Sequence, residues 1–231
     1  MAKIKYSALV SDMRNKLNGS VLSKNRYGSY VRNKVTPVNP QTQYQQEVRQ
    51  RLGSLSQTWR TLSTRQRNGW SELAKSTPFT DIFGDTKHLD GKAFFIKLNS
   101  NLLSIGQATI SSAPVLGEIP PLALDSVIAS TENDLSVTID PAVVPAGFTL
   151  KVFSTPVLPA QINFVKNRYR DLGAATVVGG AADISAAYAD RFGAIGDADE
   201  GKRIHLLAVL VATDTGQMGV PVGIEGTVQA V

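Results

Sequence analysis

The sequence predicts a multi-part α+β protein with an extended basic N-terminal arm, a small helical unit and a C-terminal immunoglobulin/fibronectin III-like β-sandwich. Three observations predict this organisation: charge is unevenly divided along the chain, apolar residues recur at helical spacing before residue 107, and they alternate at strand spacing further on. We expect the arm at 1–41, the helical unit at 42–106, a proline-containing linker at 107–122 and the sandwich at 123–231.

Charge separates the front of the chain from its back. Residues 1–60 hold eleven Lys and Arg against two acids, a net +9, and residues 61–115 hold six against four, a net +2. Residues 116–231 hold seven against thirteen, a net −6. Such a division is informative about partners rather than about fold. We expect the front of the chain to bind something negatively charged.

The arm is rich in turn formers and poor in large aliphatic side chains. Within it, Asn25, Arg26, Tyr27 and Gly28 fit the tip of a β-hairpin. The prolines that follow, at 37 and 40, stop regular structure and favour an extended path. Because so little apolar surface does not offset the entropy of ordering, we expect the arm to order against a neighbour.

Three amphipathic helices are predicted over 42–106. Thr42 is a candidate N-cap for the first, and residues 63–66 fit a capping box that begins the second, which carries Trp70. Asp90 is a candidate cap for the third. The apolar stripe of the first helix recurs in steps of three and four at Tyr44, Val48, Leu52, Leu55, Trp59 and Leu62. On the third helix, one side carries Phe94, Phe95, Leu98, Leu102 and Ile105.

Alternating residues indicate strands after the linker. Leu135, Val137 and Ile139 alternate with polar residues, and the segment 203–213 is apolar on both faces, as a central strand is. A final strand is predicted at 220–231. Strands at this spacing favour a β-sandwich of immunoglobulin or fibronectin III type. The tryptophan that immunoglobulin domains bury is missing, since both tryptophans lie in the helical part.

The sequence offers no concentrated catalytic apparatus. It has no cysteine and no Gly-x-Ser-x-Gly elbow, so thiol and elbow-type serine nucleophiles are excluded. Asp85, His88 and Asp90 could approach one metal ion, but mixed ligands in a short polar loop are more commonly solvated. We therefore expect a protein that is not an enzyme and has no cofactor or bound metal.

No stretch of the sequence predicts a membrane span or a secretion signal. The longest strongly apolar run, 206–212, is far shorter than a bilayer requires. The N-terminus lacks the apolar region of a signal peptide. We therefore expect a soluble protein with no membrane partner.

Cations interleaved with tyrosines form the candidate binding surface. This pattern suits phosphate contacts with base stacking, and it equally suits an arm that lies across an acidic protein surface. No helix-turn-helix, RNA-recognition or zinc-finger signature is present. Both partners remain open, with protein favoured. The residues concerned are Arg14, Lys16, Lys24, Arg26, Tyr27, Tyr30, Arg32, Lys34, Arg49, Arg51 and Arg60.

The front third of the chain carries a motif that runs from the arm into the helical unit. Residues 28–32 are Gly-Ser-Tyr-Val-Arg and residues 37–42 are Pro-Val-Asn-Pro-Gln-Thr, followed by Gln45, Trp59 and Trp70. This motif resembles that of a group of tailed-bacteriophage and prophage structural proteins, in which a G-x-Y-V-R…P-x-N-P-x-T-x-x-Q arm precedes a Trp-bearing helical pair. The resemblance implies a virion component such as an auxiliary capsid, head–tail or tail protein, and it implies no catalytic residues.

Charge and motif together favour a non-enzymatic phage virion structural protein, assembled in the host cytoplasm. Its arm and helices would dock to acidic surfaces of capsid or connector subunits, and its acidic sandwich would be displayed; homo-oligomers are compatible with this role. One alternative is an internal virion protein that binds nucleic acid through the arm. A third is a host- or carbohydrate-binding module in the sandwich, which has few aromatic residues for such a role.

Overall fold

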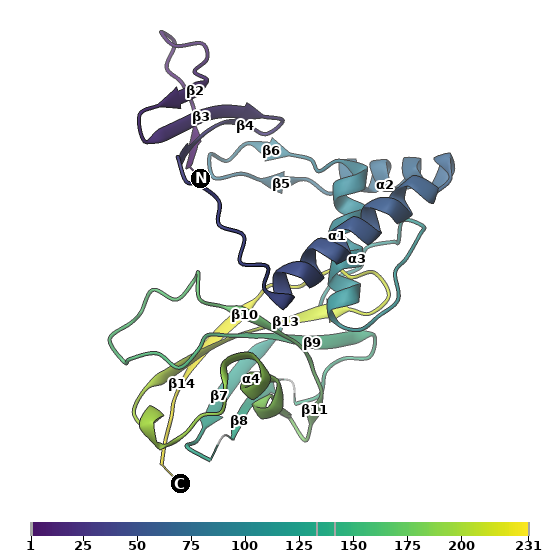
Figure 1. The fold of residues 1–231 in the computed structure, drawn as a ribbon. Coiled ribbons are helices and arrows are strands. Elements are labelled where there is room, and N and C mark those ends of the chain that lie inside the picture. Colours follow the sequence, from purple (N-terminus) through teal and green to yellow (C-terminus); the bar gives the residue numbers. More distant parts are fainter. Residues whose placement is uncertain (1, 133, 141, 231) are drawn as a thin grey trace.

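The computed structural model describes residues 2–132, 134–140 and 142–230 and confirms a mixed α+β fold. Figure 1 shows a small N-terminal sheet at one end, three helices in the middle and two larger sheets at the other end. Met1 and Val231, with which the predicted arm begins and the predicted final strand ends, lie outside the described residues.

The predicted arm forms a four-stranded antiparallel sheet, the N-terminal sheet (residues 2–33). Its order is β1-β4-β3-β2, and the hairpin tip is confirmed by the pairing of Asn25 with Gly28. Its strands are β1 (Ala2–Ile4), β2 (Asn15–Leu17), β3 (Ser20–Asn25) and β4 (Gly28–Asn33). The sequence predicts only the hairpin, because β1 and β2 are three residues each and join its edges through backbone pairing. The extended path is therefore confined to residues 34–42.

The three predicted helices are present, and their caps are mostly as expected. They are α1 (Gln43–Thr61), α2 (Thr64–Ser76) and α3 (Gly91–Ser104). Thr42 accepts a hydrogen bond from the Gln45 amide, and Ser63 and Gln66 form the predicted capping box. Asp90 precedes α3 but makes no side-chain cap bond. A short hairpin of β5 (Phe79–Thr80) and β6 (Thr86–Lys87), which the sequence did not predict, connects α2 to α3.

The helices share an aromatic core. Trp70 of α2 is fully buried and meets Phe95 of α3 edge-on, with ring centroids 5.3 Å apart. Trp59 of α1 packs on the same ring at 5.4 Å. The predicted linker is part of this packing, because the Trp70 indole donates a hydrogen bond to the Ser111 carbonyl at 2.9 Å. Ile110, Ala113 and Leu116 likewise pack on the helical core, whereas Ile119 and Leu122 pack on the core of the sheets that follow.

Residues 123–230 form two four-stranded antiparallel sheets around one core, called here the two-sheet unit. One sheet has the order β7-β8-β12-β11 and the other β14-β13-β9-β10. The first contains β7 (Ala123–Ala129), β8 (Leu135–Asp140), β11 (Val177–Val178) and β12 (Ala181–Asp183). The second contains β9 (Phe148–Ser154), β10 (Arg170–Ala175), β13 (Arg203–Ala212) and β14 (Val222–Thr227). Helix α4 (Ser185–Phe192) and a 3-10 turn at Asp197–Asp199 precede β13.

Two strands confirm the patterns on which the sheet predictions depend. Leu135, Val137 and Ile139 are buried along β8, and β13 lies between β9 and β14 as a central strand. Strand β13 is buried on both faces because α3 ends on one of them: Ile105 packs there against Val209 and Val211.

Helix α3 and the two-sheet unit meet without room for an intervening side chain. The Asn101 amide donates a hydrogen bond to the Gly216 carbonyl at 2.9 Å. A Cβ on Gly216 would collide with the Leu98 carbonyl oxygen, and its φ of +72° is a conformation that glycine tolerates best. Nearby, the buried Lys151 ammonium contacts the Ser104 hydroxyl at 2.7 Å and the Asp171 carboxylate at 2.8 Å.

We predict that Gly216→Ala destabilises the protein by about 2–4 kcal/mol, since the new methyl adds a backbone collision to the strain of a positive φ. Gly147→Ala is the matched control: its φ is +83° but open space surrounds its Cβ, so about 1 kcal/mol of backbone strain is expected. Urea unfolding of both variants measures the difference. Equal losses would show that the helix–sheet contact contributes nothing.

Candidate interaction surfaces

The register of the N-terminal sheet sorts its side chains onto two faces. Lys16, Val21 and Arg32 lie opposite one another across β2, β3 and β4, so they share one face. Tyr30, which lies opposite Lys3 on β1, belongs to the same face. Because paired residues of an antiparallel sheet point to the same side, this face gathers cations around a tyrosine.

The opposite face is aliphatic. Leu22 pairs with Val31, which in turn pairs with Ala2, and Ile4 pairs with Ser29. None of these side chains is buried, and before Leu55 no described residue of the chain is buried at all. A sheet of this kind normally covers one face with another layer. The aliphatic face of the N-terminal sheet is therefore incomplete in the single chain.

The sheet is attached to the helical unit through the β5–β6 hairpin. Lys3 pairs with Asp81 at 3.0 Å, and Lys5 pairs with Asp85 at the same distance. Phe79 receives the Tyr27 ring edge-on, with centroids 6.0 Å apart. One further pair, between Arg26 and Asp90, spans 3.3 Å. Two residues of the loop weighed as a metal site, Asp85 and Asp90, thus form ion pairs with the arm.

Asp81 is the most deeply placed member of these pairs, with its side chain 2% exposed. Burial alone would raise the pKa of its carboxyl. Hydrogen bonds from the Phe83 amide, the Lys3 ammonium and the Asp85 amide outweigh burial and lower the pKa below its ordinary value. Asp81 is therefore ionised at neutral pH and holds Lys3 in place.

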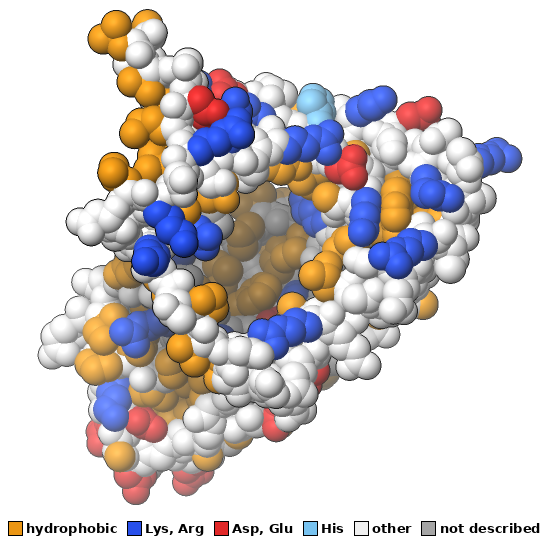
Figure 2. Space-filling model, turned by 45° about the horizontal axis from the view of Figure 1, so that its top comes forward, with side chains coloured by type: hydrophobic (Ala, Val, Ile, Leu, Met, Phe, Trp, Pro, Cys, Tyr) orange, Lys and Arg blue, Asp and Glu red, His pale blue; other side chains and the backbone are white. Residues whose placement is uncertain are grey.

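A hollow lies between the N-terminal sheet and the helical unit, with apolar side chains in its depth and cations around it (Figure 2). Two cavities flank Phe79 in this region. One, of about 310 Å³, is lined by Tyr27, Tyr30 and Lys3, and the other, of about 330 Å³, by Leu89 and Phe94 among others. Aromatic and aliphatic side chains line the hollow, and charged side chains surround its opening.

Helix α1 carries a second uncovered apolar surface. Tyr44, Val48 and Leu52 are 41%, 61% and 51% exposed, whereas Leu55 is buried. Only the second half of the predicted stripe therefore packs in the helical core. The first turns of α1 instead line a cavity together with Ser104 at the end of α3.

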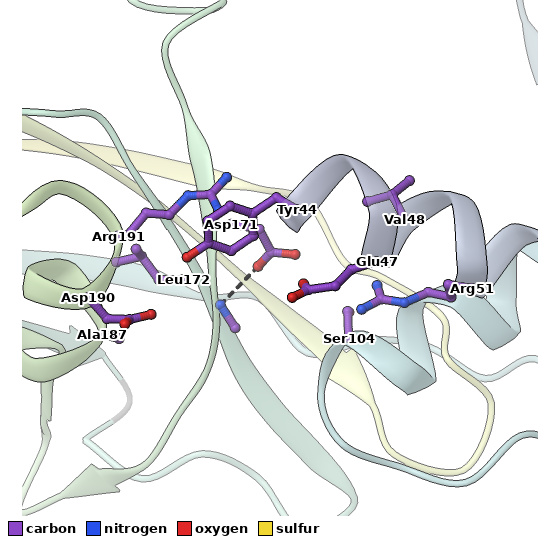
Figure 3. Close-up of a pocket in the computed structure, with 11 residues that line it drawn as sticks. Tyr44, Glu47, Val48, Arg51, Ser104, Asp171, Leu172, Ala187, Asp190 and Arg191 are labelled. Atoms are coloured by element: carbon purple, nitrogen blue, oxygen red, sulfur yellow. Dashed lines mark hydrogen bonds between the residues drawn. The ribbon is translucent and has the colours of Figure 1, made fainter. Parts of the chain in front are cut away.

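The start of α1 reaches the two-sheet unit. The Arg191 guanidinium of α4 stacks on the Tyr44 ring, 3.2 Å from its centroid, beside a cavity of about 280 Å³ (Figure 3). Across the cavity, Asp171 accepts a hydrogen bond from the Gly173 amide at 2.9 Å. Arg51 also lines it. The lining also includes three acids, Glu47, Asp171 and Asp190, and this mixture of charges suits a polar contact between layers more than a catalytic centre.

The predicted binding residues therefore do not form one site. Lys16, Tyr30 and Arg32 come together on one face of the N-terminal sheet, while Lys24 and Lys34 lie outside that group. Arg26 and Tyr27 are used for attachment to the hairpin region, and Arg14 pairs with Asp12 at 2.7 Å. The three arginines of α1, at 49, 51 and 60, lie on a separate element.

Sequence reasoning missed the contacts that hold the N-terminal sheet. Lys3 and Lys5 bind carboxylates 78 and 80 residues further along the chain, and Phe79 was not considered. The one available signal is the concentration of three aspartates between residues 81 and 90 against a single lysine, Lys87.

The described residues contain no group of three or more side chains able to hold a metal ion. In that same part of the chain, no helix has the length and apolar character of a membrane span. Comparison with protein-family models, with curated proteins and with solved structures finds no match. The case for a function therefore depends on the surfaces of this chain itself.

We predict that Asp81→Asn loosens the N-terminal sheet at pH 7, and that the native protein loosens in the same way in acid. The lowered pKa means that stabilisation by Asp81 is complete above about pH 4 and disappears as the pH falls through the folded value. Amide hydrogen exchange in β1 and β4 measures this release.

The matched control is Asp85→Asn, because the Lys5–Asp85 pair is exposed on both sides and such pairs contribute little. Exchange in β1 should change far less in this variant. If both variants exchange alike, the buried carboxylate has no special role in attachment.

Proposed function

We propose that this chain is a non-enzymatic structural protein of a bacteriophage virion, an auxiliary capsid or head–tail component assembled in the host cytoplasm. It docks through the N-terminal sheet and α1 and displays the acidic two-sheet unit. One observation carries the proposal: the N-terminal sheet buries no side chain of its own while presenting unpaired cations. The resemblance of its Gly-Ser-Tyr-Val-Arg motif to phage structural proteins supports the same role.

The cations available for docking are few and well placed. Among the described residues, Lys16, Lys24, Arg32 and Lys34 make no ion pair, while Lys3, Lys5, Arg14 and Arg26 are matched by acids of the same chain. Lys24 lies on the incomplete aliphatic face, which suits an acidic protein surface with apolar groups at its centre, and Lys16 and Arg32 lie on the opposite face. Nucleic acid would engage the cations but leave the aliphatic face uncovered.

We further propose that the two-sheet unit is an immunoglobulin-like sandwich. The order β7-β8-β12-β11 corresponds to strands A-B-E-D of that fold, and β14-β13-β9-β10 corresponds to G-F-C-C′. A parallel bridge between Ser130 and Gln229, which connects the ends of the first and last strands, supports the assignment. Domains of this architecture serve many functions, so the fold is compatible with a displayed domain and does not by itself indicate a chemical activity.

We predict that a chain lacking residues 1–40 stays folded but is lost from particles. Folding should survive because the first buried side chain is Leu55. Particles made in a host that supplies only the shortened chain, purified and quantified by mass spectrometry, should contain at least about tenfold less of it than of the full chain. Circular dichroism and thermal unfolding of the purified chain control for folding.

Normal incorporation of the shortened chain would rule out the docking role. The nucleic-acid alternative is tested separately by titrating the full chain with duplex DNA at increasing salt. Steeply salt-dependent binding that disappears on removal of residues 1–40 would favour that alternative over a protein partner.

A further inference from the structure

The outer face of the sheet β7-β8-β12-β11 is uncovered and partly apolar. Along β8, the buried residues 135, 137 and 139 face the core, so Ser136, Thr138 and Asp140 face outward. Register adds Ile128 and Asp183 to the row of Ser136. Ile128 is 53% exposed, and Val178 on the edge strand β11 is 76% exposed. This face has apolar groups near its centre and no covering layer among the described residues.

This face carries negative charge without any cation. No Lys or Arg occurs between residues 107 and 150 or between 171 and 190, the segments that supply all four strands. The exposed carboxylates on and around the face are Asp125, Glu132, Asp134, Asp140 and Asp183. Hydrogen bonds from the Ser185 hydroxyl and amide lower the pKa of Asp183, so it is charged at neutral pH.

The N-terminal sheet is the complement of this face. It presents Leu22 and Val31 on an incomplete aliphatic side, with Lys24 on the same side. Residues 2–42 contain a single acid, Asp12, which is already paired with Arg14. The two sheets lie at opposite ends of the molecule, with the helices between them (Figure 1). One chain cannot bring them together, whereas two chains can.

We propose that the N-terminal sheet of one copy docks, aliphatic face inward, on the outer face of the sheet β7-β8-β12-β11 of a second copy. This inference deepens the proposed function and rests on its docking role, because it identifies the acidic neighbour as another copy of the same chain. Aliphatic side chains meet Ile128 and Val178, while Lys24, on the same face as Leu22, meets the carboxylates. The contact is head-to-tail, so repetition gives a closed ring or an open filament.

Charge-reversal variants of the full chain test this arrangement. In the sheet-reversed variant, Lys24 and Asn33, which lie on the aliphatic face, become Glu, and in the face-reversed variant, Asp125, Asp134 and Asp140 become Lys. All five positions are exposed, and thermal unfolding checks that each variant folds. Sedimentation velocity at low salt, over a range of concentrations, measures association.

The native chain should associate beyond the dimer, and each variant should associate at least about 100-fold more weakly because like charges then meet. An equimolar mixture of the two variants offers two complementary contacts, native sheet on native face and reversed sheet on reversed face, so the two variants should alternate and associate beyond the dimer. A chain with both reversals should associate again like the native one.

Three outcomes would overturn the inference: a native chain that stays monomeric at every concentration, a face-reversed variant that still self-associates through its N-terminal sheet, or a mixture that forms no dimer. A monomeric native chain that still needs residues 1–40 to enter particles would leave the proposed function standing with a different neighbour. Salt-sensitive self-association together with normal incorporation of the shortened chain would contradict docking into particles through the N-terminal sheet and leave the contact between copies standing.

Discussion

The approach of α3 to the two-sheet unit at Gly216 is the constraint on which the rest of the arrangement depends. The helix backbone and the loop after β13 come so close that no Cβ fits, and the buried Lys151 links the adjoining strand to the end of α3. Ile105 covers the outer side of β13. Helices and sheets therefore form a single body, and α1, fixed on α3, holds its uncovered first turns beside α4.

Burial of apolar side chains decreases toward the N-terminus. The two-sheet unit and the helical unit each bury a contiguous apolar cluster, whereas the N-terminal sheet is attached by ion pairs, one aromatic contact and the residues around two cavities. Surface ion pairs contribute little each, so the buried Asp81 stands apart from the others. The molecule thus combines a rigid core with a surface module whose hydrophobic layer is incomplete.

Short sequence patterns predicted the features of the fold that depend on neighbouring residues. Helix caps at Thr42 and Ser63, the hairpin tip at Asn25 and the central position of β13 all follow from short patterns, and the structure confirms them. Contacts across long separations could not be predicted. Nothing in the sequence pairs Lys3 with Asp81. An apolar helical stripe also does not show which of its residues another element covers. The candidate surfaces depend on these long-range contacts and on which side chains are covered. Composition therefore predicted where the cations lie along the chain but not which of them share a face.

The exposed segment 34–42 limits how far the N-terminal sheet can lie from the rest of the chain. Nine residues on an extended path reach at most roughly 30 Å, and the prolines at 37 and 40 keep the path stiff. A sheet that leaves its hairpin therefore stays within a small volume around the body, at a high effective concentration for its original site. A neighbouring surface competes for the sheet only when it is held within that radius. A neighbouring subunit that assembly holds close can therefore capture the sheet, whereas a subunit free in solution cannot compete for it.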